Sequence, residues 1–258
     1  MIFDKNKLEN VILKVHENEQ NFVDLFSVCL EIDGIKRYYD DQLRDMYDHN
    51  FSLVDSIDNN ILKTINKIKT DRKEYFIKIS SPTPQDLLLE KGFEKEVTLT
   101  MVKTDYLHFP APKNYLVKYK NYRENNEIIN DIIATEILYY GELYGIDFCI
   151  RRWNRYFNKV NEGENGLNMF ATYYQDKIAG YCYAYYKNGV VCVDGLLVLK
   201  EYRNQYVASN LLAYIAHFYN CPIFLHAEND DTPKEMYEKL GFKTVSTSYD
   251  YLKIEKDK

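Results

Sequence analysis

The stretch from residue 190 to residue 218 has the pattern of a strand, a short polar turn and a helix, in that order. The strand ends near Val198, and the first turn of the helix follows Arg203. Backbone N–H groups in the first turn of a helix have no partners inside the helix, and the helix dipole adds positive potential there. The sequence therefore predicts a site for a phosphate group at this turn.

The residues of this turn resemble the phosphate loop of the Gcn5-related N-acetyltransferase (GNAT) family. That loop has Arg or Gln, two variable residues, Gly, one variable residue, and then Gly or Ala, after a strand that ends in Val. The matching residues are Arg203, Asn204, Gln205, Tyr206, Val207 and Ala208. Val198 stands five residues before the arginine, as the family pattern requires, whereas Tyr206 occupies the position of the central glycine.

A second resemblance lies in AENDDTPKEMYEKLGF, residues 227–242. This segment has an acidic strand end, a short helix with a tyrosine, and Leu-Gly-Phe, like the last signature of the same family. The two matches together cover about residues 115–254. They imply transfer of an acyl group from acetyl-CoA, or a related acyl-CoA, to an acceptor that is usually an amine.

The resemblance also implies roles for single residues. Tyr237 matches the family tyrosine that stands near the sulfur and can protonate the leaving thiolate. Leu197 and Val198 would offer backbone groups to the pantetheine arm, and Asp230 matches a position that contacts the cofactor. The phosphates would lie against Arg203, Asn204, Gln205, Tyr206, Val207, Ala208 and Ser209.

Asp194 is the acid inside the strand that leads to the loop, and by alternation it shares a face with Cys192 and Leu196. The acceptor amine must lose a proton before it attacks, and Asp194 would accept that proton if its face looks into the cleft. The alternative is an exposed acid beside the hairpin. Tyr237 has a similar alternative, as a residue packed on the sheet from an amphipathic helix.

Two predicted helices after residue 128 carry a group of aromatic side chains: Tyr139, Tyr140, Tyr144, Trp153, Tyr156 and Phe157. The family builds its acceptor pocket from these helices, so aromatic walls would suit a peptide, an aromatic amine or a sugar. The alternative is that these aromatic residues form no pocket and only reflect the composition of the chain, which has 25 tyrosines.

Composition excludes several classes of protein. The chain has 258 residues, 46% hydrophobic and 28% charged, which is typical of a folded protein. Its 33 basic and 39 acidic residues give a net charge of −6, so nucleic acid is not an expected partner. The 5 cysteines have no CxxC spacing, and neither His217 nor His226 has metal-ligand spacing, so no disulfide or metal is predicted.

A cytoplasmic protein is expected, because the first residues lack the layout of a signal peptide. Residues 204–227 contain no Asp, Glu, Lys or Arg, which is long enough for a membrane span. Their polar residues and Pro222 instead predict a helix, a turn and a buried strand, so no membrane contact is expected.

Hydrophobic periodicity places the elements around these residues. Phe22, Leu25, Phe26 and Cys29 recur at helical spacing, and residues 61–68 do the same. Alternating segments predict strands at 74–80 and 96–103 and a three-strand antiparallel meander at 168–198. In the meander, Asn188-Gly189 is a strong hairpin signal. The expected class is α+β, with a GNAT-like three-layer architecture in which helices flank a mixed, mostly antiparallel sheet.

Two further helices have predicted apolar faces. The expected inner residues are Ile129, Ile132, Ile133, Ile137 and Leu138 in the first, and Val207, Leu211, Ile215 and Phe218 in the second.

The chain also resembles itself, because residues 83–93 align with residues 232–242 without a gap. Each copy begins Thr-Pro, as a helix start with a capping threonine would, and each ends in Gly-Phe. The alternative is a common helix-start pattern used twice. We favour two lobes: a degenerate GNAT-like lobe at 1–105 without a cofactor site, a linker at 106–114 that contains two prolines, and a GNAT domain at 115–258.

Three functions remain open at this point. The first is an acyl-CoA-dependent N-acyltransferase that uses acetyl-CoA as co-substrate and acylates a small-molecule or peptide amine. The second is a non-catalytic binding or dimerisation module whose phosphate loop is closed by Tyr206. The third is aminoacyl transfer from charged tRNA, which the acidic balance disfavours. A homodimer is compatible with the first two.

Overall fold

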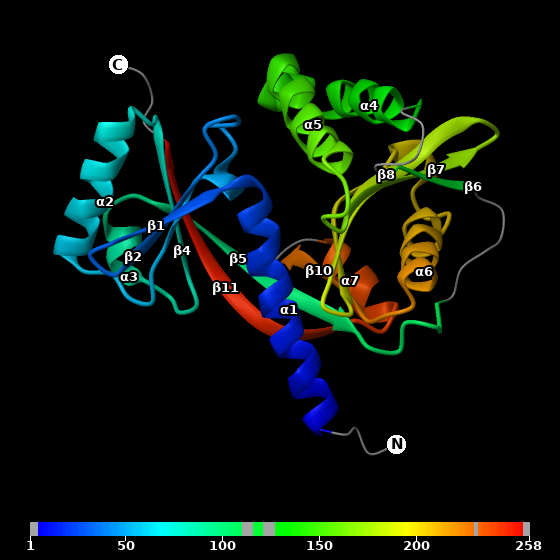
Figure 1. Ribbon diagram of the computed structural model, residues 1–258, viewed down its shortest axis with the longest axis horizontal. Coiled ribbons are helices and arrows are strands. Elements are labelled where there is room, and N and C mark those ends of the chain that lie inside the picture. Colours follow the sequence, from blue (N-terminus) through cyan, green and yellow to red (C-terminus); the bar gives the residue numbers. More distant parts are fainter. Residues whose placement is uncertain (1–4, 110–115, 121–126, 230–231, 255–258) are drawn as a thin grey trace. The chain divides into compact units, whose positions relative to one another are not determined.

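The computed structural model describes residues 5–109, 116–120, 127–229 and 232–254 (Figure 1). The chain forms two compact units. Unit 1 comprises Met1–Phe22, Met101–His226 and Glu235–Lys243, and unit 2 comprises Val23–Thr100, Ala227–Lys234 and Thr244–Lys258. These units are divided differently from the segments 1–105 and 115–258, so the two GNAT-like lobes remain a prediction.

Unit 1 contains the three strands of the predicted meander, β7 (Leu167–Tyr174), β8 (Lys177–Lys187) and β9 (Val190–Val198). It also contains β6 (Leu116–Lys120) and most of β10 (Ile223–Glu228). The order is β10-β9-β8-β7-β6, with β10 parallel to β9 and the other pairs antiparallel. Asn188 and Gly189 connect β8 to β9 with φ of 53° and 78°, the left-handed conformation of a type I′ hairpin turn.

Helices cover both faces of this sheet (Figure 1). They are α1 (Lys5–Phe26), α4 (Glu127–Tyr144), α5 (Ile146–Asn161), α6 (Val207–Tyr219) and α7 (Thr232–Lys239). Tyr183 of β8 stacks on Tyr156 of α5, whereas Phe170 of β7 meets Phe218 of α6. Phe170 pairs with Cys182, the residue next to Tyr183, and adjacent strand residues point to opposite faces, so α5 and α6 cover opposite sides.

Two predicted core positions of these helices are exposed. Leu138 of α4 is 78% exposed and Phe218 of α6 is 42% exposed. The prediction was wrong for Leu138, whereas the Phe218 ring, although partly exposed, packs on the buried Phe170 of the sheet as an apolar face requires. Ile132, Leu211 and Ile215, near the centre of the apolar stripes of these helices, are fully buried as predicted.

Unit 2 is built on a second set of strands in the order β1-β2-β3-β4-β11-β5. They are β1 (Val28–Ile32), β2 (Ile35–Tyr39), β3 (Ser52–Leu53), β4 (Phe76–Ser81), β5 (Glu94–Lys103) and β11 (Lys243–Ile254). The helices are α2 (Asn59–Arg72) and α3 (Asp86–Glu90), with 3-10 turns η1 (Tyr47–His49) here and η2 (Lys200–Tyr202) in unit 1.

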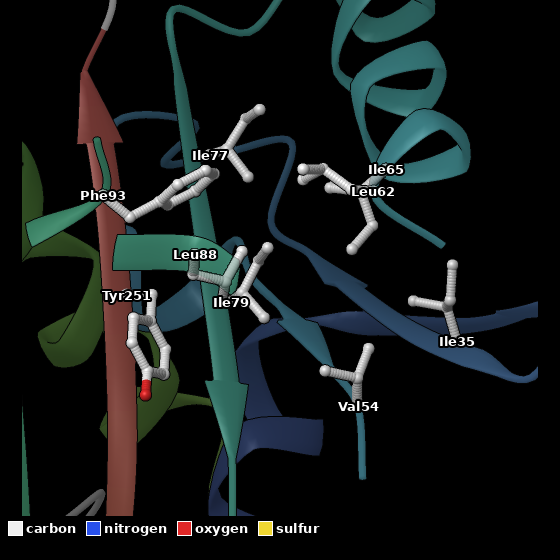
Figure 2. Close-up of a cluster of buried hydrophobic side chains, with 9 residues drawn as sticks. All are labelled: Ile35, Val54, Leu62, Ile65, Ile77, Ile79, Leu88, Phe93 and Tyr251. Atoms are coloured by element: carbon white, nitrogen blue, oxygen red, sulfur yellow. The ribbon is translucent and has the colours of Figure 1, made fainter. Parts of the chain in front are cut away.

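Figure 2 shows the core of unit 2, where α2, α3 and the strands meet. Its members are Ile35, Val54, Leu62, Ile65, Ile77, Ile79, Leu88, Phe93 and Tyr251. The Tyr251 hydroxyl accepts a hydrogen bond of 2.7 Å from the Gln85 backbone N–H, so this buried phenol is also satisfied.

Cys29 lies in strand β1 and not in a helix with Phe22 and Phe26. The helix ends at Phe26, and residues 28–39 form a hairpin whose turn residues Asp33 and Gly34 have φ of 51° and 78°. The helical spacing misled because the Asp-Gly turn and the apolar residues on each side of it favour a hairpin more strongly.

The two aligned segments have the same backbone ending. Phe93 N–H donates to the Leu88 carbonyl and Phe242 N–H donates to the Tyr237 carbonyl, each at 3.0 Å. Before each phenylalanine stands a glycine with positive φ. In the first copy the predicted capping threonine, Thr83, is wrong. Helix α3 starts at Asp86 and its N-cap is Gln85, two residues after Thr83.

None of the helices in the described residues is long and apolar enough to cross a membrane.

Candidate functional site

The predicted phosphate loop joins β9 to α6 in unit 1. Asn204 has φ of 60° and Tyr206 has φ of 63°, so both are left-handed. Tyr206 is the N-cap of α6 and makes no side-chain cap hydrogen bond, and the first turn of α6 contains no acidic residue. The Val207 and Ala208 N–H groups of that turn, which have no intrahelical carbonyl to bind, therefore form a site suited to an anion.

Tyr206 keeps the backbone conformation that glycine favours at this position. Its side chain is 64% exposed, so the ring points to solvent. A tyrosine in the left-handed region costs on the order of 1 kcal/mol relative to the right-handed one. The turn is therefore formed in spite of the residue type, and most of the tyrosine side chain lies in solvent.

The polar loop residues make local contacts. Arg203 is exposed, and its Nε donates to the Val198 carbonyl at 3.2 Å. The Gln205 amide donates to the Glu201 carbonyl at 2.9 Å, and the Ser209 hydroxyl donates to the Tyr206 carbonyl at 3.0 Å. These bonds hold the loop against the end of β9 and the start of α6.

Strands β9 and β10 pair over a short distance and then part. The parallel register joins Val191 with Ile223, residue 192 with residue 224, and Val193 with Leu225. Beyond Leu225, no pairing of β10 with β9 is found among the described residues. We call this point the fork. Ligands of mixed α/β sheets bind beyond the carboxyl ends of parallel strands, which is where the fork and the phosphate loop both lie.

A β-bulge lies in β9 directly after the fork. Tyr183 of β8 pairs with Asp194, and Tyr181 pairs with Leu197, so β9 has one extra residue there. Gly195 lies in this bulge with φ of 61°. A side chain at Gly195 would clash with the Tyr183 ring, whose Cε1 would lie 2.9 Å from the added Cβ. The bulge interrupts the ladder hydrogen bonds beside the predicted pantetheine residues Leu197 and Val198.

Asp194 stands at the bulge and is half-buried. Its Oδ2 accepts from the Tyr183 hydroxyl at 2.7 Å, and its Oδ1 accepts from the Gly195 N–H at 2.6 Å. Burial raises the pKa of the Tyr183 phenol well above its usual range, and the Asp194 carboxylate adds to the shift. Tyr183 therefore stays protonated and donates to the carboxylate.

Tyr237 lies on α7 and is 7% exposed, with its ring 5.7 Å from the Phe242 ring. Its role at the sulfur remains a prediction. Asp230 lies outside the described residues.

The aromatic residues predicted to line an acceptor pocket separate into two groups. Trp153 and Tyr156 are buried, and both rings contact Tyr183. Tyr139 and Tyr140 are only partly buried, and Tyr139 OH accepts from the Lys200 N–H at 2.8 Å. The buried pair therefore belongs to the core beside the bulge.

Sequence reasoning missed a contribution from α1. The Asn18 amide is buried and donates to the carbonyls of Tyr185 and Val190 at 3.3 and 3.2 Å. Phe22 stacks on Tyr183 with ring centroids 5.6 Å apart. Glu19 Oε1 lies 2.8 Å from His226 Nε2. Glu19 and His226 are 207 residues apart, so no local pattern could have revealed the pair.

The four buried cysteines are Cys149, Cys182, Cys192 and Cys221, and burial raises the pKa of each thiol. The pKa rises to about 11 for Cys192 and about 12 for Cys221. Within the described ranges, no group of three or more His, Cys, Asp or Glu side chains is placed to hold a metal ion.

Residues 149–251 match the family model described as an acetyltransferase (GNAT) domain. The resemblance to the GNAT superfamily is thereby confirmed for this part of the chain, which contains the bulge, the phosphate loop and α7. No curated protein matches the sequence.

Solved structures share the fold over nearly the whole chain. A functionally unknown conserved protein from Staphylococcus epidermidis ATCC 12228 is 21% identical, with a TM-score of 0.76 over 90% of this chain and 97% of its own. A GCN5-related N-acetyltransferase from Kribbella flavida is 15% identical, with a TM-score of 0.64 over 92% of this chain and 93% of its own.

A tandem GNAT protein from the clavulanic acid biosynthesis pathway is 11% identical, with a TM-score of 0.54 over 94% of this chain and 96% of its own. At these identities the likeness shows the fold. The predicted GNAT-like α+β class, with a mixed and mostly antiparallel sheet flanked by helices, is confirmed.

Proposed function

We propose that this protein is an acyl-CoA-dependent N-acyltransferase that moves an acetyl group from acetyl-CoA to an amine. The observation that carries the proposal is the uncapped start of α6, set behind a left-handed turn at the end of β9 where β9 and β10 part. The acetyltransferase domain matched at residues 149–251 contains all of these features.

The loop suits the pyrophosphate of coenzyme A. The N–H groups of Val207 and Ala208 supply donors, Arg203 supplies a nearby positive charge, and no carboxylate in the first turn of α6 repels an anion. The Tyr206 side chain is 64% exposed, whereas Val207 and Ala208 behind it are buried, at 1% and 8% exposure. The pantetheine arm would run along Leu197 and Val198, where the bulge disturbs the ladder of β8 and β9.

Acyl transfer to an amine needs two proton movements. The amine must lose a proton, and Asp194 is the proposed acceptor because it is an acid at the fork with its carboxylate held by Tyr183 and Gly195. The leaving thiolate must gain a proton, and Tyr237 is the proposed donor.

Direct transfer from thioester to amine fits the chemistry of the cysteines. A covalent route needs a thiolate nucleophile, and the nucleophile must be activated by a base or a lowered pKa. Burial instead raises the pKa of Cys192, the cysteine nearest the fork in β9, to about 11. We therefore expect the acyl group to pass to the amine in a ternary complex, with no acyl-cysteine intermediate.

The alternative is a non-catalytic module whose phosphate loop is closed by Tyr206. A closed loop requires the ring to cover the α6 amides, and the 64% exposure of Tyr206 does not favour that arrangement. The acceptor in our proposal is a small-molecule or peptide amine. A homodimer and a cytoplasmic location are parts of the same proposal.

Calorimetric titration with acetyl-CoA tests the loop. A ligand at a hundredfold excess over its Kd should also raise the free energy of unfolding by about 2.7 kcal/mol. Tyr206→Glu places a carboxylate beside the α6 amides and should weaken binding at least tenfold. Tyr144→Glu, at another exposed tyrosine on α4, is the matched control and should bind like the parent. If the parent does not bind acetyl-CoA at millimolar concentration, the result favours the non-catalytic alternative.

A further inference from the structure

Strand β1 stands at the end of the strand order of unit 2, and among the described residues it pairs with β2 alone. Val28 is 54% exposed and Leu30 is 46% exposed, and Cys29 and Glu31 are exposed as well. An open edge strand offers backbone N–H and C=O groups to which another strand can bind. Proteins usually protect such an edge with proline, lysine or a bulge. Strand β1 contains neither proline nor lysine, and its register with β2 runs without a shift.

The hairpin turn determines which backbone groups of β1 point to the open edge. The two residues after Ile32 are both left-handed and form a two-residue turn, so Ile32 and Ile35 are a hydrogen-bonded pair. Hydrogen-bonded and non-hydrogen-bonded pairs alternate along antiparallel strands, which makes Cys29 and Tyr38 a non-hydrogen-bonded pair. In agreement, the Tyr38 N–H donates to the Phe51 carbonyl, on the other side of β2.

The backbone of β1 is complementary to itself. By the same alternation, the N–H and C=O groups of Cys29 and Glu31 point away from β2, whereas those of Leu30 are used in the hairpin. A twofold axis at Leu30 would bring Cys29 of one copy opposite Glu31 of another. Each such pair can exchange both of its backbone hydrogen bonds, so the open edges of two copies satisfy each other.

Other registers of this self-pairing fit less well. A twofold axis at Cys29 would use the N–H of Ser27, which already donates to the Val23 carbonyl at 2.9 Å. An axis at Glu31 would place two carboxylates directly opposite each other, and like charges in that position destabilise a strand pair. An axis at Leu30 avoids both problems, because Glu31 then faces Cys29 of the other copy.

The apolar side chains of β1 extend the core face of unit 2 beyond its cover. Val28 pairs with Tyr39 of β2, which by alternation shares a face with Ile35 of the core (Figure 2). Helix α2 reaches as far as β2, where the Arg72 guanidinium lies 4.0 Å from the centre of the Tyr39 ring. Val28 and Leu30, one strand further out, remain about half exposed. The core face therefore has an apolar margin at the open edge.

We propose that β1 is a dimerisation strand, which pairs antiparallel with β1 of a second copy of this chain about a twofold axis at Leu30. The two Leu30 side chains then meet, and Val28 meets Ile32 of the other copy. Both contacts fall in non-hydrogen-bonded pairs, where side chains approach most closely. Two copies that use the same surface form a closed dimer, and neither keeps an open β1 edge. The inference rests on the homodimer of the proposed function and does not depend on acyl transfer.

Cysteine cross-linking tests the register. The background is Cys29→Ser, in which the four remaining cysteines are buried. Leu30→Cys in this background should give a disulfide-linked dimer on oxidation, because facing Cα atoms of such a pair lie about 4.5 Å apart. Val28→Cys, at a similarly exposed residue, is the matched control. Its counterpart in the other copy would lie more than about 13 Å away, so it should stay unlinked.

The natural cysteine gives an independent measurement of the register. The two Cys29 Cα atoms of the proposed dimer lie about 8 to 9 Å apart, beyond the roughly 7 Å limit for a disulfide, so the parent should not cross-link. Glu31→Cys places a thiol opposite Cys29 of the other copy and should cross-link readily. A parent protein that oxidises to a Cys29-linked dimer would overturn the axis at Leu30.

Sedimentation velocity over a range of protein concentrations measures the dimer without any cross-link. A strand of 5 residues gives a small interface, and small interfaces are typical of dimers that exchange with monomer. Leu30→Lys should raise the Kd of the dimer roughly tenfold or more, because two ammonium groups would face each other. Leu138→Lys, at a leucine of α4 that is 78% exposed, is the control and should leave the Kd unchanged. Thermal unfolding checks that both variants are folded.

The outcomes separate this interface from the proposed function. If the parent is a dimer whose Kd does not change in Leu30→Lys, or if Val28→Cys cross-links as well as Leu30→Cys, the β1 pairing is wrong and the homodimer stands. If the parent is monomeric at its highest soluble concentration, the homodimer and the β1 pairing both fail. Titration with acetyl-CoA decides the acyltransferase proposal separately in either case.

Discussion

The Tyr183 hydroxyl of β8 donates a hydrogen bond of 2.7 Å to the carboxylate of Asp194, which stands at the bulge in β9. The same tyrosine stacks on Tyr156 of α5 and on Phe22 of α1. Packing from two helices therefore fixes the donor, and the donor fixes the carboxylate. An acid held in this way keeps one orientation.

If Asp194 accepts the amine proton, Asp194→Asn should lower the rate of acyl transfer by roughly 10² to 10⁴. The loss should be greatest at low pH and smaller at high pH, where more of the amine is already neutral. The rate is measured from pH 6 to pH 9. Asp147→Asn, at an exposed acid of α5, is the control and should have no effect. An equal loss at every pH would remove Asp194 as the base.

Tyr237→Phe keeps the ring packed against Phe242 and removes only the hydroxyl. If Tyr237 protonates the leaving thiolate, turnover should fall by roughly 10² to 10⁴ while the Kd for acetyl-CoA stays nearly constant. The rate of thiol release measures turnover, and calorimetric titration measures the Kd for acetyl-CoA. Tyr186→Phe, at a partly exposed position of β8, serves as control. Full activity in Tyr237→Phe would leave water as the proton donor.

Tyr206→Gly should stabilise the fold by about 1 kcal/mol at most, because glycine adopts the left-handed φ without strain. Binding of acetyl-CoA should be unchanged or tighter. Asn204→Gly is a good comparison, since asparagine already tolerates its φ of 60° and should gain little. Thermal unfolding measures the change in stability, and calorimetric titration measures the affinity for acetyl-CoA. A large loss of affinity in Tyr206→Gly would mean that the ring itself contacts the ligand.

The Glu19 carboxylate makes the free energy of unfolding depend on pH in the acid range. Its pKa is about 2 in the folded protein and about 4.5 in the unfolded chain, so folding favours the ionised form. The stabilisation, on the order of 2 kcal/mol, is fully present above pH 4.5 and is lost as the pH falls toward 2. Urea unfolding between pH 6 and pH 2.5 should show a steeper loss for the parent than for Glu19→Gln. If the two proteins lose stability in parallel as the pH falls, the contacts of Glu19 with His16 and His226 do not stabilise the fold.

Residues 115–258 produced alone should be poorly soluble. Unit 1 would then lack α1, and Phe22 would no longer cover Tyr183 and Tyr185. Joining residues 1–22 to this fragment through a flexible linker should restore solubility, which light scattering can measure. A monomeric, folded fragment 115–258 that binds acetyl-CoA fully would show that α1 is dispensable for this unit.

The sequence predicted those parts of the molecule that local chemistry determines. Asn188-Gly189 specifies a turn with both residues left-handed, and the structure has it. The phosphate loop followed from residues that are adjacent in the chain. In contrast, Leu138 was assigned to the core from spacing alone, and the edge of a helical stripe cannot be located without knowing what packs on it.

The contacts between α1 and the strands at the fork could not be predicted from the sequence, and the reason is a different one. The contacts of Asn18, Glu19 and Phe22 with the strands join residues more than a hundred positions apart, and each residue type is common on helix surfaces. Bonds of this kind depend on how elements meet in space. The same holds for Asp194, whose alternation with Cys192 was visible but whose bond to Tyr183 depends on the register of two strands.

Of the five cysteines, Cys29 alone is exposed, on strand β1, and the other four are buried with raised pKa values. A maleimide reacts with thiols that it can reach from solvent. The natural sequence therefore accepts a single dye or spin label at β1 of unit 2 without any substitution. A label placed there would let fluorescence or electron spin resonance follow unit 2 while acetyl-CoA is titrated into unit 1.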